Sequence, residues 1–373
     1  MKPAHMDYPE AVVMNIVIKV GTQAILAADG TLMKSAIKAL VRQVAKLQQA
    51  GHNVVLVSSG AVASGRKVAA EVLGRKFGAT LGEKQVLASM GQHELMNAYA
   101  KLFKPYKMAT AQLLLTKQDF HTRKHYLNIA RLLREVSANR HIVAVINEND
   151  SVAVEELMFT DNDELSGLIA AQINADKLII LTSVNGVYDG HPDEKGSKLI
   201  PVIDPEKDGW PTVSSTKTPL GRGGMATKLG TARKMSDIGI TTHIAALREK
   251  DVILKIAKGT DTGTKILPRR KKSGLKRWMA FDESKKTGSI RVNQPLFDIL
   301  KENNRVISLL PVGIRSCAGD FKKGDLVDVA APDGTTIGIG IARYDAEKLR
   351  EYMGQKGKPA FIHYDHLHLK GGR

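Results

Sequence analysis

The first 264 residues alternate short aliphatic runs with longer segments in which apolar residues recur every three or four positions. The aliphatic runs have the length and composition of strands that are buried on both faces. They cover residues 12–20, 53–58, 108–115, 142–146, 177–182 and 240–246. This alternation predicts a three-layer αβα sandwich, an α/β fold in which helices cover both faces of a mainly parallel sheet.

The longer segments between these strands have the periodicity of amphipathic helices. The first of them places its apolar residues on one face: Leu32, Ile37, Leu40, Val41, Val44 and Leu47. Asp29 or Thr31 can cap its start, and Gly51 follows its end. Further helices are expected over residues 84–102, 126–138, 164–173 and 226–237. Ligands of such sheets bind outside the carboxyl ends of the strands, so we expect the chemistry of this domain there.

From Gly288 onward the pattern changes to short strands separated by turn signals such as Pro332-Asp333-Gly334. The expected strands cover residues 289–292, 308–310, 326–330, 336–341 and 361–363. This texture predicts a second, small β-rich domain. We therefore expect three parts: an α/β domain over residues 1–264, a linker over 265–278 and the β-rich domain over 279–373.

The composition of the 373 residues, with 43% hydrophobic and 25% charged, is that of a soluble globular protein and excludes collagen, disorder and disulfide scaffolds. A single cysteine, Cys317, cannot form an internal disulfide and fits a reducing compartment. No apolar run approaches the ~18 residues of a membrane-spanning helix, and the start does not have the pattern of a signal peptide. These features predict a cytoplasmic protein without a membrane partner.

The formal net charge of +17 is concentrated in part in one segment. Residues 265–278 contain seven Lys and Arg residues and no acidic residue. Such a run is ordinarily a solvated connector. The alternative is a binding segment for an anionic partner, such as RNA, near the domain junction.

The first two expected strands end in residues suited to anions. The first ends in Lys19, and the following Gly21 would let a ligand approach the backbone. The second runs into Ser59 and Gly60, where small residues before a helix expose free backbone N–H groups. A lysine at a sheet edge and a plain strand-to-helix turn are the structural alternatives.

Polar residues also follow the strand at 142–146. Asn147 to Asp150 are four polar residues in a row, which indicates either a ligand with amine or amide character or a solvated loop. Further along, Asp161 can cap a helix. Asn162 and Asp163 then require another explanation, such as holding lysines in place.

A glycine-rich segment, Gly221-Arg222-Gly223-Gly224, precedes Met225, Ala226, Thr227 and Lys228 at the start of a helix. It suits a polyphosphate, although an ordinary flexible loop has the same composition. Its context is wrong for a dinucleotide-binding fingerprint, because it follows a polar stretch and not a strand. The motifs of P-loop NTPases and protein kinases do not occur. No Cys or carboxylate completes a metal site with His363, His366 and His368, so none is expected.

Together these motifs resemble the amino acid kinase family over nearly the whole chain. The resemblance is carried by IKVGT, VVLVSSGAVASG, LASMGQ, QLLLT, VINENDSVA, FTDNDELS, KLIILT and GGMATK, in the family's order. The C-terminal part resembles the PUA module through residues 308–314, 321–325 and 361–363. The NEND motif combined with a PUA module is similar to the members that phosphorylate glutamate. It separates them from the kinases of acetylglutamate, aspartate, carbamate and uridylate.

This resemblance implies transfer of the γ-phosphoryl group of ATP, with Mg²⁺, to the side-chain carboxylate of L-glutamate. The product would be glutamyl 5-phosphate, in the first step of proline biosynthesis. Feedback inhibition by proline and a homo-oligomer are also expected. Two alternatives are a kinase of the same fold for another small acid or nucleotide, and an RNA-binding regulatory protein that acts through the PUA module.

The resemblance also implies roles for individual residues. Lys19 and Lys228 would be catalytic by supplying positive charge, and Asp163 would orient both. Glutamate would be held by Ser59, Gly60, Asn147, Asp150 and Asn162. ATP would be held by Lys19, Thr182, Ser183, Gly223, Gly224, Met225, Ala226, Thr227 and Lys228. Mg²⁺ would be held largely by the phosphates and water, and no dedicated set of protein ligands is predicted. Ser183 and Arg222 depart from the family, which commonly has Asp and Thr there.

Overall fold

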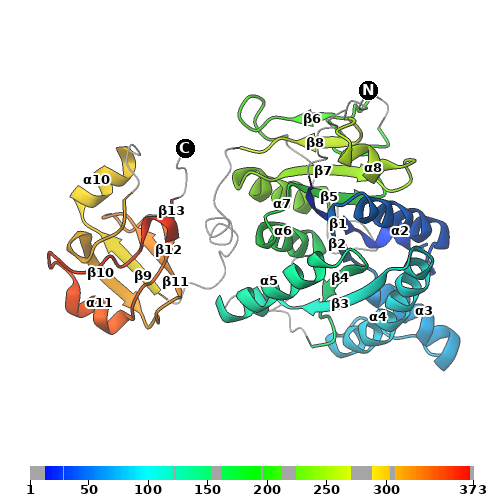
Figure 1. Cartoon of the computed structure of the whole chain (residues 1–373), viewed down its shortest axis with the longest axis horizontal. Coiled ribbons are helices and arrows are strands. Elements are labelled where there is room, and N and C mark those ends of the chain that lie inside the picture. The colour runs from blue at the N-terminus through cyan, green and yellow to red at the C-terminus, as the bar shows by residue number, and fades with distance from the viewer. Residues whose placement is uncertain are drawn as a thin grey trace, which may run out of the picture.

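The computed structural model of the chain describes residues 13–27, 29–120, 123–152, 161–194, 196–211, 224–269, 288–302 and 307–369. These residues form an eight-stranded sheet in the first domain and a five-stranded sheet in the second (Figure 1). The described helices do not include one that is both long and apolar enough to cross a membrane.

The larger sheet has the order β3-β4-β2-β1-β5-β7-β8-β6. Its strands are β1 (Asn15–Val20), β2 (Asn53–Ser58), β3 (Ala109–Leu115), β4 (Ile142–Glu148), β5 (Lys177–Thr182), β6 (Val202–Ile203), β7 (Thr241–Ala246) and β8 (Thr264–Ile266). Each neighbouring pair is parallel except β7 and β8. The six predicted strands and the mainly parallel sheet are confirmed. The two short strands β6 and β8 were not predicted, because two or three residues carry no periodicity.

Helices cover both faces of this sheet, as predicted. One hydrophobic core joins a sheet face to α5 (Arg123–Ala138), α6 (Asn162–Gln172) and α7 (Met225–Asp237). The other joins the opposite face to α1 (Thr22–Ile25), α2 (Lys34–Gln49), α4 (Leu81–Phe103) and α8 (Val252–Ala257). Figure 1 shows α5, α6 and α7 on the side of the sheet that is nearer the second domain.

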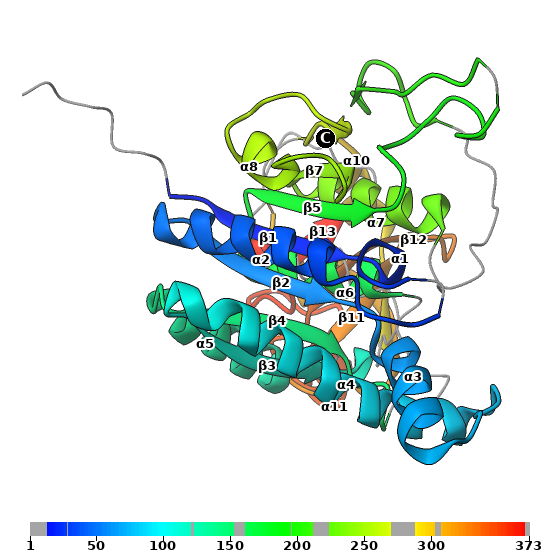
Figure 2. The same ribbon diagram turned by 90° about the vertical axis from the view of Figure 1, so that its right-hand side faces the viewer.

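The helix α3 (Ala61–Leu73) begins just beyond the end of β2 and packs against α4. Figure 2 shows β1, β2 and β5 running in one direction, with α3 beyond their arrowheads. A Cβ atom on Gly91 of α4 would lie 1.8 Å from the Ala61 carbonyl oxygen and 2.3 Å from the Gly65 backbone nitrogen, both on α3. The two helices therefore meet backbone to backbone, directly behind the carboxyl edge of the sheet.

The second domain has a sheet of order β10-β9-β11-β12-β13. Its elements are β9 (Gly288–Val292), α10 (Gln294–Glu302), β10 (Ile314–Gly319), β11 (Leu326–Ala330), β12 (Thr336–Ile341), α11 (Ala346–Tyr352) and β13 (Leu367–Leu369). The expected strands over 308–310 and 361–363 are wrong: these segments form an isolated bridge between Leu309 and Ile362. Phe321 and Phe361 pack in its core with ring centroids 5.5 Å apart.

The two domains touch through Tyr126 of α5. Its side chain packs against the core of the α/β domain and also against Leu326, Ile339 and Ile341 of the second sheet. The expected division after residue 264 falls inside β8. Beyond it, the backbone N–H of Arg269 donates to the Ser236 carbonyl at 2.9 Å, so the bonded structure of the first domain extends to Arg269.

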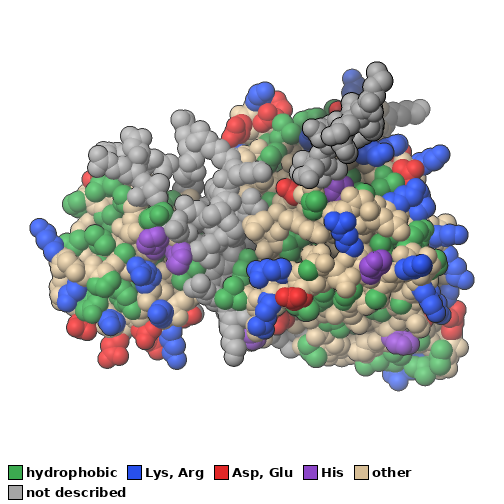
Figure 3. Space-filling view, viewed as in Figure 1, with side chains coloured by type: hydrophobic (Ala, Val, Ile, Leu, Met, Phe, Trp, Pro, Cys, Tyr) green, Lys and Arg blue, Asp and Glu red, His purple; other side chains and the backbone are tan. Residues whose placement is uncertain are grey.

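Basic side chains on the first domain do not form a single patch on the face shown in Figure 3, where Lys and Arg are spread out. The segment with the largest basic excess, residues 265–278, is described only as far as residue 269.

One buried histidine is not among the predicted site residues. His243 of β7 is 3% exposed, and neither ring nitrogen has a hydrogen-bond partner in the described part of the chain. Burial, together with the charges of Lys177 and Lys265, lowers the pKa of His243 from 6.5 to about 3. Between these two values the unfolded chain binds a proton at this residue that the folded chain does not. The folded state therefore loses stability as the pH falls through this window.

Replacing this histidine should reduce the acid sensitivity of the fold. The unfolding free energy lost through protonation of His243 is at most ~1.4 kcal/mol per pH unit, and His243→Leu removes this contribution. We expect the variant to lose less unfolding free energy than the wild type between pH 7 and pH 5. Denaturant unfolding at the two pH values measures the difference. Equal losses in the two proteins would contradict this account of His243.

Candidate active site

Three charged side chains meet at the carboxyl edge of the larger sheet. Lys19 comes from the end of β1, Lys228 from the first turns of α7, and Asp163 from the start of α6. The Asp163 carboxylate lies 2.5 Å from the Lys19 Nζ and 2.9 Å from the Lys228 Nζ. Asp163 is fully buried, and the lysines are 4% and 7% exposed. The structure thus brings together the three residues that were predicted to be catalytic.

The shared carboxylate stays ionised in spite of its burial. Burial alone would raise the pKa of Asp163, but the ammonium groups of Lys19 and Lys228 outweigh it and hold the pKa at about 2. One buried carboxylate thus holds two ammonium groups close together. Two ammonium groups share one carboxylate, so one positive charge has no partner of its own. Because a buried charge is costly unless it is paired, this arrangement is suited to an anion that approaches both lysines.

The start of α6 is fixed by Asp161, as predicted for a helix cap. Its side chain accepts hydrogen bonds from the backbone N–H groups of Asp163 at 2.8 Å and Glu164 at 3.2 Å. Burial and the neighbouring Asp163 carboxylate raise the pKa of Asp161. The cap places Asn162 and Asp163 in the first turn of α6, where both side chains reach the ends of neighbouring strands.

Asn162 connects two of the other predicted residues. Its Nδ2 donates to the Ser59 Oγ and to the Asn147 Oδ1, both at 2.9 Å. Its own Oδ1 is buried without a hydrogen-bond partner in the described part of the structure. Ser59, Asn147 and Asn162 therefore form one polar group that joins the ends of β2 and β4 to α6. The free acceptor on Asn162 suits a ligand that carries a hydrogen-bond donor, such as an amine.

Two further predicted residues lie beside this group. Gly60 caps α3 with φ of 110°, a left-handed conformation that favours glycine, and an added Cβ would lie 3.1 Å from the Leu26 Cδ1. The N-terminus of α3 thus points its free N–H groups to the sheet edge. Asp150 is half-buried in the turn after β4.

The residues predicted to hold a nucleotide lie on the other side of Lys19. Thr182 ends β5, the strand next to β1, and the Ser183 Oγ donates to the Gln23 Oε1 at 3.3 Å. Gly224 caps α7, and the Thr227 Oγ1 donates to the Gly224 carbonyl at 2.8 Å. Met225 and Ala226 open that helix, whose N-terminus favours a phosphate. Gly223 and Arg222 lie outside the described residues.

One polar residue of this site had no predicted role. The Oε1 of Gln92, on α4, accepts a hydrogen bond from the Asn147 Nδ2 at 2.9 Å, and Gln92 is 8% exposed. Two signals were available: Gln92 ends the LASMGQ motif, and it lies on the same helix face as the buried Ala88, Leu95 and Tyr99. A lone amide in a buried apolar stripe requires a polar partner.

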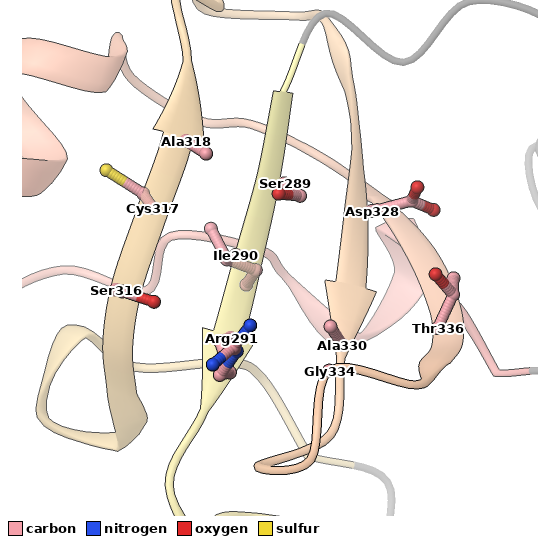
Figure 4. Close-up of a pocket in the computed structure, with 10 residues that line it drawn as sticks. All are labelled: Ser289, Ile290, Arg291, Ser316, Cys317, Ala318, Asp328, Ala330, Gly334 and Thr336. Atoms are coloured by element: carbon pink, nitrogen blue, oxygen red, sulfur yellow. The ribbon is translucent and has the colours of Figure 1, made fainter.

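Neither a metal cluster nor the hollow of the second domain adds to this site in the described part of the chain. Among the described side chains, no group of three or more His, Cys, Asp and Glu residues could hold a metal ion. A hollow of about 260 Å³ lies on the sheet of the second domain, where β9 to β12 carry small side chains together with Arg291 and Asp328 (Figure 4). None of the predicted site residues lines it.

Comparison with known proteins identifies the class. The model of the amino acid kinase family matches residues 14–246, which is more than half of the chain, and the PUA domain model matches residues 290–359. The chain belongs to the amino acid kinase family and carries a PUA domain.

Relatives in this family match the sequence over nearly its whole length. The glutamate 5-kinase of Chlorobaculum tepidum is 43% identical over 365 residues, which cover 98% of this chain and 99% of the relative. The glutamate 5-kinase of Bacteroides thetaiotaomicron is 39% identical over 358 residues, which cover 95% and 98%.

Proposed function

We propose that this protein transfers the γ-phosphoryl group of ATP to the side-chain carboxylate of L-glutamate, the activity in the name of its relatives. An oxygen of the carboxylate forms a bond to the γ-phosphorus while the bond to the bridging oxygen of ADP breaks. The products are glutamyl 5-phosphate and ADP, in the first step of proline biosynthesis. The observation that carries the proposal is the pair of buried lysines held on Asp163 at 2.5 and 2.9 Å.

The site provides what this reaction needs. A glutamate side chain has an ordinary pKa of ~4.3, so the acceptor is already ionised and requires no general base. The barrier arises instead from the repulsion between two anions and from the need for in-line alignment. Lys19 and Lys228 offset the repulsion, and Asp163 fixes their positions. Mg²⁺, bound to the phosphates and water, would neutralise further phosphate charge.

Each substrate has its own set of groups around these lysines. The Asn162 Oδ1 can accept a hydrogen bond from the amino group of glutamate, next to Ser59 and Asn147. The N-terminus of α3, with Gly60, favours a carboxylate. On the ATP side, Gly224 to Lys228 offer the N-terminus of α7 to the phosphates, and Thr182 and Ser183 lie at the neighbouring strand end.

A substrate panel tests this function. ADP release should depend on L-glutamate and should stay at background with L-aspartate, N-acetylglutamate or UMP. Proline resembles the amino-acid part of glutamate, so it should raise the apparent KM for glutamate and leave kcat unchanged. Turnover with UMP or another acid in preference to glutamate would contradict the proposed substrate. Inhibition that persists at saturating glutamate would contradict a shared proline site.

We further propose that the protein works in the cytoplasm as a homo-oligomer and that its PUA domain contacts RNA. The support for RNA is the PUA match together with the basic run that begins at Lys265. Binding to RNA that weakens steeply as salt is added is the expected behaviour of such a contact.

A further inference from the structure

One backbone donor fixes the orientation of the Asn147 side-chain amide, and with it the donors and acceptors of the hydrogen bonds around it. The Glu148 N–H donates to the Asn147 Oδ1 at 2.9 Å, and a backbone N–H can only donate. The Asn147 Oδ1 must therefore be the acceptor for Asn162, and its Nδ2 must point the other way. That Nδ2 is buried, because Asn147 is 2% exposed, and it donates to the Gln92 Oε1.

Gln92 thus provides the acceptor that keeps the side chain of Asn147 in this position. Without it, a buried Asn147 donor would be left unsatisfied, and the side chain would rotate to find another partner. Its Oδ1 would then leave the Asn162 Nδ2, and the free Asn162 acceptor would lose its fixed direction. The sequence of contacts runs from α4 through the end of β4 to the first turn of α6.

The helix that carries Gln92 is itself held firmly at this place. Seven residues further along α4, the Tyr99 hydroxyl lies 2.8 Å from the Ser58 Oγ at the end of β2. One residue before Gln92, Gly91 packs directly on the backbone of α3. The face of α4 with Gln92 and Tyr99 therefore contacts the ends of both strands that supply Asn147 and Ser59.

We propose that Gln92 is a positioning residue for the amino-acid substrate, acting through Asn147 and Asn162 on the affinity for glutamate. This inference rests on the proposed function for the identity of the substrate. Gln92 bonds to Asn147, whereas both lysines are held by Asp163, so the effect of Gln92 is on glutamate binding and not on the lysines that face the phosphates.

The chain offers a closely matched control. Gln48 of α2 is also buried, at 3% exposure, and its Nε2 donates to the Ile142 carbonyl at 3.0 Å. Both glutamines thus hold β4 by one hydrogen bond, Gln48 at the start of the strand and Gln92 at its end. Only Gln92 lies at the carboxyl edge with the site.

The test compares Gln92→Leu with Gln48→Leu in the full-length protein. Gln92→Leu should raise the KM for glutamate about tenfold, the effect of ~1.4 kcal/mol, and leave kcat and the KM for ATP within about twofold. Gln48→Leu should leave all three unchanged, although both variants should melt at a lower temperature. If Gln92→Leu does not fold, the unbranched Gln92→Met replaces it with the same expectation.

A double-mutant cycle separates the positioning role from a direct contact. In a background with Asn147→Ala, Gln92→Leu should raise the KM for glutamate by less than about twofold, because its effect runs through Asn147. Additive effects would overturn the proposal, as would a Gln92→Leu variant with a lower melting temperature and an unchanged KM. Wild-type turnover in the same assay tests the function separately, since a wild type inactive on glutamate refutes the substrate and not the contacts of Gln92.

Discussion

Lys228→Ala should lower kcat by ~10²–10³-fold and raise the KM values far less. This is the scale expected for the loss of one preorganised group that stabilises developing charge. Lys228 and Lys19 are held on one buried carboxylate, so their charge counts most in the transition state, where the two anions are closest. Lys19→Ala should have the same effect. Steady-state ADP release with both substrates varied measures the split between kcat and KM.

Three further variants sharpen this experiment. Lys228→Arg should restore little of the kcat that Lys228→Ala loses, because a planar guanidinium cannot occupy the place of a compact ammonium. Asp163→Asn should lower kcat as the lysine variants do, since it keeps the size of the side chain but removes the charge that holds both lysines. Lys101 is exposed on α4, so Lys101→Ala should be silent. A Lys228→Ala variant with an intact kcat and a raised KM for ATP would make Lys228 a ground-state nucleotide contact instead.

Gly91→Ala should destabilise the fold by about 3 kcal/mol and also raise the KM for glutamate. The added Cβ would lie 1.8 Å from the Ala61 carbonyl oxygen and 2.3 Å from the Gly65 nitrogen. Both are backbone atoms, so no side chain can rotate away, and the two helices must separate. Because α3 begins at Ala61, directly after Ser59 and Gly60, its displacement would move the glutamate side of the site. Denaturant unfolding and steady-state kinetics measure the two effects.

The matched control for this substitution lies on the same helix. Gly82 is in the first turn of α4, and an added Cβ there would have no atom within 4 Å. Gly82→Ala should therefore stabilise the protein slightly, by ~0.5–1 kcal/mol, through helix propensity alone. Equal effects of Gly91→Ala and Gly82→Ala would show that α3 and α4 can separate without cost.

The grouping of Lys19, Lys228 and Asp163 could be predicted from the resemblance to the amino acid kinase family, and the topology accounts for it. Parallel strands end at one edge, and the end of β1 with Lys19 meets the starts of the helices that carry Asp163 and Lys228 there. The role of Gln92 could not be predicted in this way. It depends on how closely α4 approaches the strand ends, which the glycine contact between α3 and α4 decides in three dimensions. Short elements such as β8 were missed because a three-residue strand is fixed by its neighbours and not by its own pattern.

The ring of Tyr126 belongs to two hydrophobic clusters at once, one in each domain. Exchange of the PUA domain between members of this family is therefore not a matter of joining two independent pieces at the linker. A chimera would have to carry over the apolar surface formed by Leu326, Ile339 and Ile341 together with an aromatic residue at position 126. Among the described residues, the fit of the Tyr126 side chain thus limits recombination at the domain junction.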